Sequence, residues 1–305
     1  MSQAKILITG TDLAAPAVAM LSDYELVFAG DMPSEQKIID CCAAHNPVAI
    51  ILRYSKVGAA AMDAAPALKV ISKHGSGTDT IDKQAAAERG IAVVAAAGAN
   101  AAAVAEHALA LMLACAKQVV HLDKRMHTGH WDKATHKSIE LEGRVLGLVG
   151  MGAIGQRFAR MAQAMGMQVL GFDPFAKTFP PAVNAVSLSH VLAQADVLSL
   201  HCPLTADNKN MLNAETLRQC KDGVIIVNTA RGGLIDEPAL LAALNSGKVH
   251  SAGLDSFAVE PMTAPHIFHG HPRIVLSPHI GGVSLDAYVK MGVGAAENAL
   301  AVLRQ

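Results

Sequence analysis

LGLVGMGAIGQRFARMAQAMG, residues Leu146 to Gly166, is the stretch of sequence that decides the fold. An apolar strand pattern leads into Gly150, Gly152 and Gly155, and an amphipathic helix pattern follows directly. In such a sequence the first glycine makes a tight turn, the second lets the backbone approach a pyrophosphate, and the third lets helix and strand pack closely. The stretch therefore predicts a strand–turn–helix unit that binds a dinucleotide.

An acidic residue at the end of the next predicted strand strengthens this interpretation. Asp173 closes MQVLGFD, 18 residues after Gly155, where a carboxylate can accept hydrogen bonds from both ribose hydroxyls of an adenosine. The alternative is a solvated acid in a turn before Pro174. Because strand, glycines, helix and acid occur together, we predict a dinucleotide site. The absence of arginine from DPFAKTF favours NAD over its 2′-phosphorylated form.

Short β-branched runs alternate with longer helical patterns in both halves of the chain. The first half contains KILIT, VAIILR, LKVIS and IAVVA, and the second contains RVLGLVG, MQVLGFD, ADVLSLH, GVIIVN, SAGLD and RIVLSP. Such alternation implies parallel sheets covered by helices on both faces. We therefore predict an α/β fold of two Rossmann-like, doubly wound parallel-sheet domains with a cleft between them.

Composition limits the possible partners. The 305 residues are 51% hydrophobic and carry a formal net charge of -1, which leaves no basic excess for binding nucleic acid or lipid headgroups. Five cysteines without a CxxC pair favour reduced, buried thiols over disulfides or a metal site. The N-terminal apolar run is too short for a signal peptide, and Ala108 to Ala116 is too short to cross a membrane. We expect a cytoplasmic protein that binds a small molecule.

Chemically active side chains follow several strands of the second half. Ligands of open parallel sheets bind beyond the carboxyl ends of the strands, so these side chains should face one site. Arg231 can hold a carboxylate through two parallel hydrogen bonds. His279 can donate a proton, and Glu260 can keep that histidine protonated. Taken singly, they fit a surface ion pair, a solvated histidine and a loop acid, but together they supply what hydride transfer to a 2-oxo acid requires.

The motifs GMGAIG, HCPLT, NTARGGLID, GLDSFAVEP and SPHIGG, in this order and with Asp173 after the first, resemble the D-isomer-specific 2-hydroxyacid dehydrogenases. Further similarities are KHGSGTDTID, which resembles the family's substrate loop, and VAEHALALMLA, which resembles its long dimer-forming helix. The resemblance implies an NAD-binding Rossmann domain at residues 100–282 and a discontinuous substrate-binding (catalytic) domain at residues 1–99 and 283–305. It also implies a homodimer formed through the cofactor domain.

The resemblance implies a role for each matched residue. Arg231 would bind and polarise the substrate, His279 would be the acid/base, and Glu260 its partner. Asp255 would contact the nicotinamide carboxamide. The expected cofactor contacts are Gly150, Gly152, Ala153, Ile154, Gly155, Asp173, His201, Pro203, Thr205, Thr229, Ala230, Asp255, His279 and Gly281. The expected substrate contacts are Tyr54, Lys73, Ser76, Gly77 and Arg231, and no metal is expected.

Polar and basic side chains follow two strands of the first half, in RYSK (residues 53–56) and KHGS (residues 73–76). A pocket lined by them should reject branched apolar acids, whose side chains would desolvate these groups without pairing them. We therefore expect NAD-dependent interconversion of a small polar 2-oxo acid and its D-2-hydroxy acid. Hydroxypyruvate or glyoxylate is the first choice, and a phosphorylated or sulfonated three-carbon acid, held by Arg53 or Lys73, is the second.

Other interpretations concern the polarity of the pocket and the function of the fold. Serine stands at residues 76 and 256, where the family often has valine, so the polarity of the pocket can differ from the usual one. A non-enzymatic NAD-sensing interaction protein on the same fold is the alternative function, because a fold alone does not fix an activity. A methyltransferase would leave Arg231, Glu260 and His279 without a role.

Overall fold

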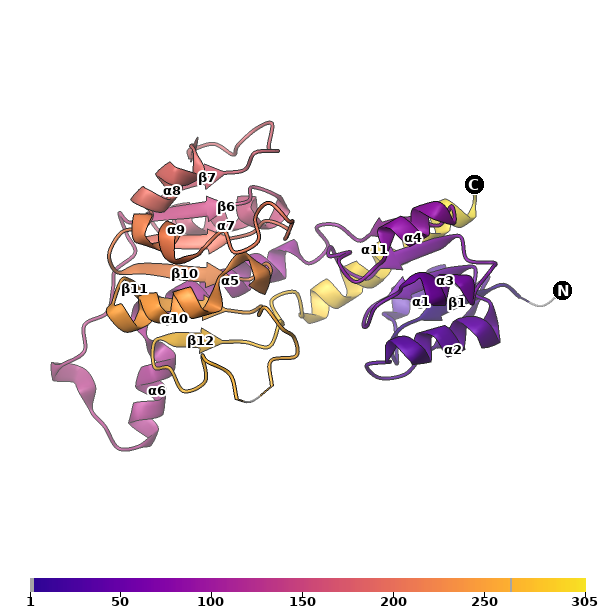
Figure 1. Cartoon of the computed structure of the whole chain (residues 1–305), viewed down its shortest axis with the longest axis horizontal. Helices are drawn as coiled ribbons and strands as arrows, with labels where there is room; N and C mark the ends of the chain where they lie inside the picture. Colours follow the sequence, from indigo (N-terminus) through magenta and orange to yellow (C-terminus); the bar gives the residue numbers. More distant parts are fainter. Residues whose placement is uncertain (1–2, 264) are drawn as a thin grey trace. The chain divides into compact units, whose positions relative to one another are not determined.

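The computed structural model describes residues 3–263 and 265–305 of the chain (Figure 1). The chain divides into two compact units, called unit 1 (Met1–Asn100 with Val283–Gln305) and unit 2 (Ala101–Gly282). Each unit has its own parallel sheet and its own hydrophobic cores. The predicted α/β fold with two Rossmann-like parallel sheets is therefore confirmed.

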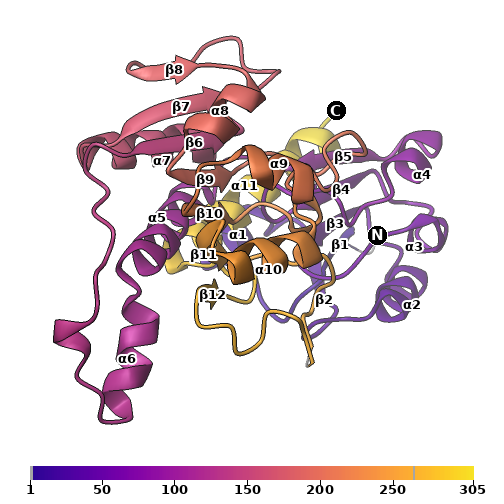
Figure 2. The same cartoon turned by 60° about the vertical axis from the view of Figure 1, so that its left-hand side comes forward.

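Unit 1 is built on a five-stranded parallel sheet of order β2-β1-β3-β4-β5 (Figure 2). Its strands are β1 (Lys5–Ile8), β2 (Glu25–Phe28), β3 (Ala49–Leu52), β4 (Val70–Lys73) and β5 (Ala92–Ala95). Its helices are α1 (Ala15–Met20), α2 (Glu35–His45), α3 (Ala59–Asp63), α4 (Lys83–Glu88) and α11 (Leu285–Leu303). The strand order reverses between β1 and β3, and open α/β sheets bind ligands beyond the carboxyl ends of strands at such a reversal.

The sheet of unit 1 is buried on both faces, as its apolar strands require. Ile6 and Ile8 pack with α1 and α11 on one face, whereas Leu7 packs with α2, α3 and α4 on the other. All three side chains are fully buried. Burial of each stabilises the fold by about 1.5–3 kcal/mol relative to exposure. Alternate residues of one strand thus hold two helical layers.

Unit 2 contains a seven-stranded parallel sheet of order β12-β11-β10-β9-β6-β7-β8. Its strands are β6 (Val145–Val149), β7 (Gln168–Phe172), β8 (Val183–Ala185), β9 (Val197–Leu200), β10 (Val224–Asn228), β11 (Val249–Leu254) and β12 (Ile274–Leu276). Its helices are α5 (Ala101–Lys117), α6 (Val119–His127), α7 (Ala153–Ala164), α8 (Leu188–Gln194), α9 (Ala214–Gln219) and α10 (Glu237–Ser246), with 3-10 turns η1 (Asp132–Ala134) and η2 (Gly232–Leu234). Here the order reverses between β6 and β9.

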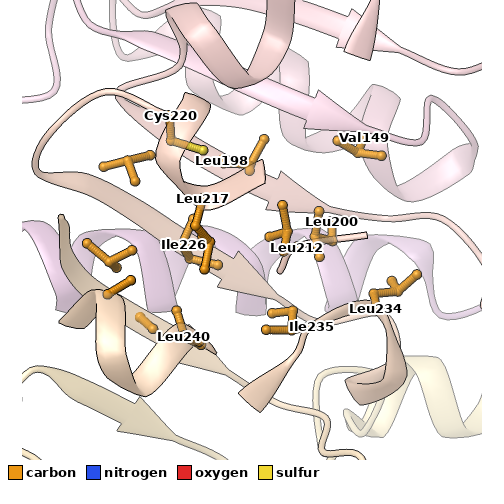
Figure 3. Close-up of a cluster of buried hydrophobic side chains, with 14 of the residues drawn as sticks. Val149, Leu198, Leu200, Leu212, Leu217, Cys220, Ile226, Leu234, Ile235 and Leu240 are labelled. Carbon is orange, nitrogen blue, oxygen red and sulfur yellow. The ribbon is translucent and has the colours of Figure 1, made fainter. Parts of the chain in front are cut away.

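Separate cores cover the two faces of the unit 2 sheet. Ile226 on β10 belongs to the cluster drawn in Figure 3, which also contains Leu217 of α9 and Leu240 of α10. Its neighbours Ile225 and Val227 belong to the core on the other face, which includes residues of α5 and α7. Strand β10 is therefore packed between two helical layers, and this packing fixes the start of the loop that follows it.

Helix α6 differs from the other long helices because none of its residues is buried. Figures 1 and 2 both show α6 and the segment after it extending away from the sheet of unit 2. Helix α5, by contrast, buries eight of its residues. Among the described residues no single helix is long and apolar enough to cross a membrane; α5 and α6 pass that test only as a pair, bent by 61°.

The cysteines are free thiols, as the sequence predicts. Cys41, Cys42, Cys115 and Cys220 are buried, and Cys202 is half-buried. Burial raises the pKa of both Cys42 and Cys115 to about 12, so these two thiols are protonated and unreactive at neutral pH.

Candidate active site

The glycine loop joins β6 to α7, and each of its three glycines meets a different need. Gly150 has φ +99, and a Cβ there would lie 2.6 Å from the carbonyl oxygen of His201. A Cβ on Gly155 would lie 2.2 Å from the carbonyl oxygen of Gly150. No atom lies within 4 Å of a Cβ built on Gly152, the N-cap of α7. Room beside the N-terminus of a helix suits the pyrophosphate of a dinucleotide.

Asp173 ties the end of β7 to the glycine loop. Its Oδ2 accepts a hydrogen bond of 2.8 Å from the Met151 N–H. Its Oδ1 accepts from the N–H groups of Phe175 and Ala176, at 2.9 and 3.2 Å. A carboxylate has about four acceptor positions, so one remains for a ribose hydroxyl. The sequence pattern predicted the ribose contact but missed this structural role, which only the folded chain reveals.

Three buried polar atoms at the ends of neighbouring strands have no hydrogen-bond partner among the described residues. They are His201 Nδ1 after β9, Thr229 Oγ1 after β10 and Ser256 Oγ after β11. Buried polar atoms are nearly always paired, so this edge fits a bound polar molecule such as a dinucleotide. The other nitrogen of His201, Nε2, lies 2.9 Å from Ser199 Oγ. Burial lowers the pKa of His201 to about 4, which keeps it neutral at neutral pH.

Asn208 shapes the loop that follows His201. Its Nδ2 donates to the carbonyl oxygen of Pro203 at 2.8 Å, and its Oδ1 accepts from the Thr205 N–H at 2.7 Å. Pro203 and Thr205 are exposed at this edge, where the sequence predicts cofactor contacts. The sequence pattern gave no signal for Asn208, because its role depends on how the loop closes.

The backbone that carries Arg231 is fixed by the fully buried Asn228. Asn228 Oδ1 accepts from the Ala230 N–H at 3.0 Å, and its Nδ2 donates to the carbonyl oxygen of Arg231 at 2.9 Å. A Cβ on Gly232 would lie 1.9 Å from the carbonyl carbon of Phe257, so only glycine fits there. Arg231 is therefore presented from a rigid turn at the end of β10, and Asn228 is a second positioning residue that sequence reasoning missed.

Glu260 and His279 form an ion pair in unit 2, with Glu260 Oε2 2.6 Å from His279 Nδ1. The hydrogen bond that His279 donates to Glu260 raises the pKa of His279 above its ordinary value, against the effects of burial and of the Arg231 charge. Burial favours the neutral form of Glu260, but hydrogen bonds from His279 and the Phe257 N–H lower its pKa overall. The charges of Arg231, Glu260 and His279 act on one another, so the structure brings the three predicted catalytic residues together.

Asp255 holds the segment that presents His279. It is buried, and its Oδ1 accepts from Ser277 Oγ at 2.6 Å and from the Ile280 N–H at 2.9 Å. Its Oδ2 accepts from the Gly281 N–H at 2.7 Å. His279 itself has φ +54, in the left-handed region. A strained backbone of this kind persists only where surrounding contacts fix it. Asp255 therefore positions His279. The sequence predicted a contact between Asp255 and the nicotinamide, but not this structural role.

In unit 1 the predicted substrate residues follow β3 and β4, which are paired with Leu52 opposite Lys73. Lys73 Nζ donates to the carbonyl oxygen of Arg53 at 3.0 Å. Ser76 Oγ donates to Asn100 Oδ1 and accepts from the Gly98 N–H, both at 3.3 Å. The Ser76 hydroxyl therefore takes part in holding its own loop. Tyr54 and Gly77 lie at the same edge, exposed and half-buried respectively.

Comparison with known proteins identifies the family. Residues 109–281 match the model of the D-isomer specific 2-hydroxyacid dehydrogenase, NAD binding domain. This chain belongs to that family. It is 42% identical over 252 residues to a hydroxypyruvate reductase of Thermotoga maritima, covering 82% of each chain. The resemblance predicted from the motifs, the enzyme class of NAD-dependent 2-hydroxyacid oxidoreductases and the NAD cofactor are thus confirmed.

Two further relatives differ from each other in length and in the substrate that appears in their names. A D-3-phosphoglycerate dehydrogenase of Mycobacterium leprae is 37% identical over 297 residues, which are 96% of this chain but 56% of that protein. The crystal structure of a glyoxylate reductase from Paecilomyes thermophila aligns with a TM-score of 0.89 at 32% identity, covering 100% of this chain and 97% of that chain. These relatives give no support to the alternative of a non-enzymatic NAD sensor.

Proposed function

We propose that this chain uses NADH to reduce a small polar 2-oxo acid to the D-2-hydroxy acid, with hydroxypyruvate or glyoxylate as the first choice. The observation that supports this proposal most strongly is the 2.6 Å contact between Glu260 Oε2 and His279 Nδ1, a pair on which the charge of Arg231 also acts. This arrangement provides a carboxylate anchor and a protonated imidazole together. The relatives named hydroxypyruvate reductase and glyoxylate reductase support the same substrate class.

Each residue has one role in this proposal. Arg231 binds the substrate carboxylate and polarises the adjacent carbonyl. His279 donates its proton to the carbonyl oxygen, and Glu260 keeps the imidazole protonated until that transfer. Bound NADH supplies the hydride that forms the new C–H bond on the carbonyl carbon. Asp255 holds His279 in place through the backbone of residues 280 and 281.

The cofactor site proposed for residues 100–282 follows the carboxyl edge of the unit 2 sheet. The loop around Gly152 would hold the pyrophosphate, and Asp173 the adenosine ribose. Proposed contacts with the rest of the dinucleotide come from the ends of later strands and the loops after them: His201, Pro203, Thr205, Thr229, Ala230, Asp255, His279 and Gly281.

We propose that residues 1–99 and 283–305 supply the substrate contacts other than that of Arg231. We propose that Ser76 and Gly77 offer backbone N–H groups to the substrate carboxylate and that Tyr54 and Lys73 meet its distal end. A phosphorylated three-carbon acid is the second candidate, favoured by the similarity to the D-3-phosphoglycerate dehydrogenase. Measuring kcat/KM with NADH for glyoxylate, hydroxypyruvate, pyruvate, phenylpyruvate, 3-phosphohydroxypyruvate and sulfopyruvate separates these candidates. A best rate with phenylpyruvate would remove the polar-pocket proposal.

A homodimer formed through unit 2 is proposed as the assembly, in the reducing environment of the cytoplasm. Eight of the 17 residues of α5 are buried within unit 2, so the support for a dimer is taken from the residues that follow α5. Val119 and Met126 on α6 and Trp131 after it are 52%, 53% and 74% exposed, more apolar surface than a solvated helix requires. Light scattering at micromolar concentration should give twice the mass of the chain, and the mass of a single chain would refute the dimer.

A further inference from the structure

An ion pair lies where the strand order of unit 1 reverses. Asp12 follows β1 and Arg53 follows β3, two strands that pair in parallel. Arg53 Nη1 donates to the Asp12 carboxylate, and also to the Asp12 carbonyl oxygen at 2.6 Å. Open α/β sheets bind their ligands at this position, so the charge of the pair acts on any ligand bound there.

Two aromatic rings hold Arg53 in place. The guanidinium carbon lies 5.2 Å from the ring centroid of Tyr54 and 5.1 Å from that of Tyr288, on α11. The Tyr288 hydroxyl also donates to Asp12 Oδ2 at 2.9 Å. The side chain of Arg53 is consequently only 10% exposed, whereas that of Asp12 is 60% exposed. The member of the pair that meets solvent is the carboxylate.

Around this pair, at neutral pH, the neighbouring groups are a neutral histidine and a charged lysine. The hydrogen bond from Arg53 lowers the pKa of Asp12, so the carboxylate is ionised. Burial, followed by the Arg53 charge, lowers the pKa of His74 to about 4, so this histidine is neutral. Lys73 adds a positive charge at the same edge and donates to the backbone of Arg53.

We propose that Asp12 is a specificity-determining residue that excludes 2-oxo acids carrying a phosphate or sulfonate on the distal carbon. The inference rests on the proposed function and selects within it, favouring an uncharged acid such as hydroxypyruvate over its 3-phosphate. A phosphate beside Asp12 meets a like charge. Arg53 reaches that phosphate only by giving up its ion pair with Asp12 and its contacts with both rings. The phosphate is therefore excluded in two ways: the Asp12 carboxylate repels it, and the favourable contacts of Arg53 keep the guanidinium from binding it.

The test compares two substrates in three proteins. We measure kcat/KM with NADH for 3-phosphohydroxypyruvate and for hydroxypyruvate in the wild type, in Asp12→Asn and in Asp31→Asn. Asp31 is an exposed aspartate in the loop after β2, so it is the matched control. Asp12→Asn should raise the ratio of phosphorylated to unphosphorylated kcat/KM by about tenfold, mainly through KM. Asp31→Asn should leave the ratio unchanged.

A double variant identifies the group that becomes available. Adding Arg53→Met to Asp12→Asn should abolish the gain, because the released guanidinium is the cation that binds the phosphate. An unchanged ratio in folded Asp12→Asn overturns the proposal, as does a wild type that prefers the phosphorylated acid. Should Asp12→Asn fail to fold, Asp12→Ser serves in its place under the same criteria.

A binding measurement separates failure of this inference from failure of the proposed function. Inorganic phosphate should raise the melting temperature of Asp12→Asn more than that of the wild type or Asp31→Asn, whether or not any 2-oxo acid is reduced. Equal shifts in the three proteins would overturn the inference alone. Absence of activity on every 2-oxo acid, with the phosphate effect present, would overturn the proposed function alone.

Discussion

Glu260 Oε2 lies 2.6 Å from His279 Nδ1. With Nδ1 bonded to the carboxylate, Nε2 is the nitrogen of the imidazole that is left to give a proton to a substrate. Glu260 is itself held by the Phe257 N–H, so the orientation of the pair is set from the carboxylate side. On the other side, Asp255 fixes the backbone around His279 through residues 280 and 281. The proton donor is therefore placed by two acids with separate roles.

Replacing His279 removes the proposed proton donor. His279→Ala should lower kcat for 2-oxo acid reduction by about 10²- to 10⁴-fold, which is what positioned proton transfer contributes. Steady-state kinetics with saturating NADH measures this loss, with His190→Ala, an exposed position on α8, as the control. Turnover close to that of the wild type would show that another group supplies the proton.

Replacing Glu260 changes the pH dependence. The hydrogen bond that His279 donates to Glu260 raises the pKa of His279, and reduction requires the protonated imidazole. Activity is therefore present below this pKa and is lost as pH rises through it. Glu260→Gln removes the negative charge and lowers the pKa, so the alkaline limb of the kcat/KM profile should move to lower pH. A limb that stays in place would mean that the pair does not control protonation.

Asp173 should set the preference for NADH. Its carboxylate repels the 2′-phosphate of NADPH, so the wild type should have the higher kcat/KM with NADH. Asp173→Ala should reduce that preference. It should also lower the melting temperature, because the Met151 N–H loses its acceptor. Equal kcat/KM for the two cofactors in the wild type would contradict the assignment.

Two histidines make stability depend on pH. Burial lowers the folded-state pKa of His74 and of His201 to about 4, whereas an unfolded histidine has a pKa of about 6.5. Between these pH values the unfolded chain binds more protons than the folded chain. The contribution of the two histidines to the free energy of unfolding should therefore be fully present above pH 6.5 and be lost as pH falls towards 4. His201→Gln should give a shallower fall of melting temperature, and the exposed His190→Gln the wild-type fall. Identical slopes in all three proteins would refute this cause.

The sequence predicts those parts of the fold that are encoded by a pattern of neighbouring residues. Long buried strands such as β6 and β10 follow from their apolar runs, and the glycine loop follows from its spacing. The strands β2 and β8 were missed because both are partly exposed: β2 begins with the charged Glu25, and β8 has only three residues with Asn184 at its centre. Both lie at an edge of their sheets, where one side of the strand is unpaired.

Contacts between distant residues could not be predicted in the same way. Asp12 and Arg53 lie 41 residues apart in the chain, and Tyr288 joins them from α11. The sequence therefore suggested Arg53 as an anion-binding residue, whereas in the folded protein its charge is already paired. The roles of Asn228 and Asp255 depend likewise on the three-dimensional course of the loops that they hold.

The most direct test of the central claim is the product of one reaction. Wild-type protein is incubated with hydroxypyruvate and NADH, and both the loss of NADH absorbance and the configuration of the product are measured. The account predicts that NADH is consumed in equal amount to the D-glycerate formed. Formation of L-glycerate, or no consumption of NADH with hydroxypyruvate or glyoxylate, would contradict it.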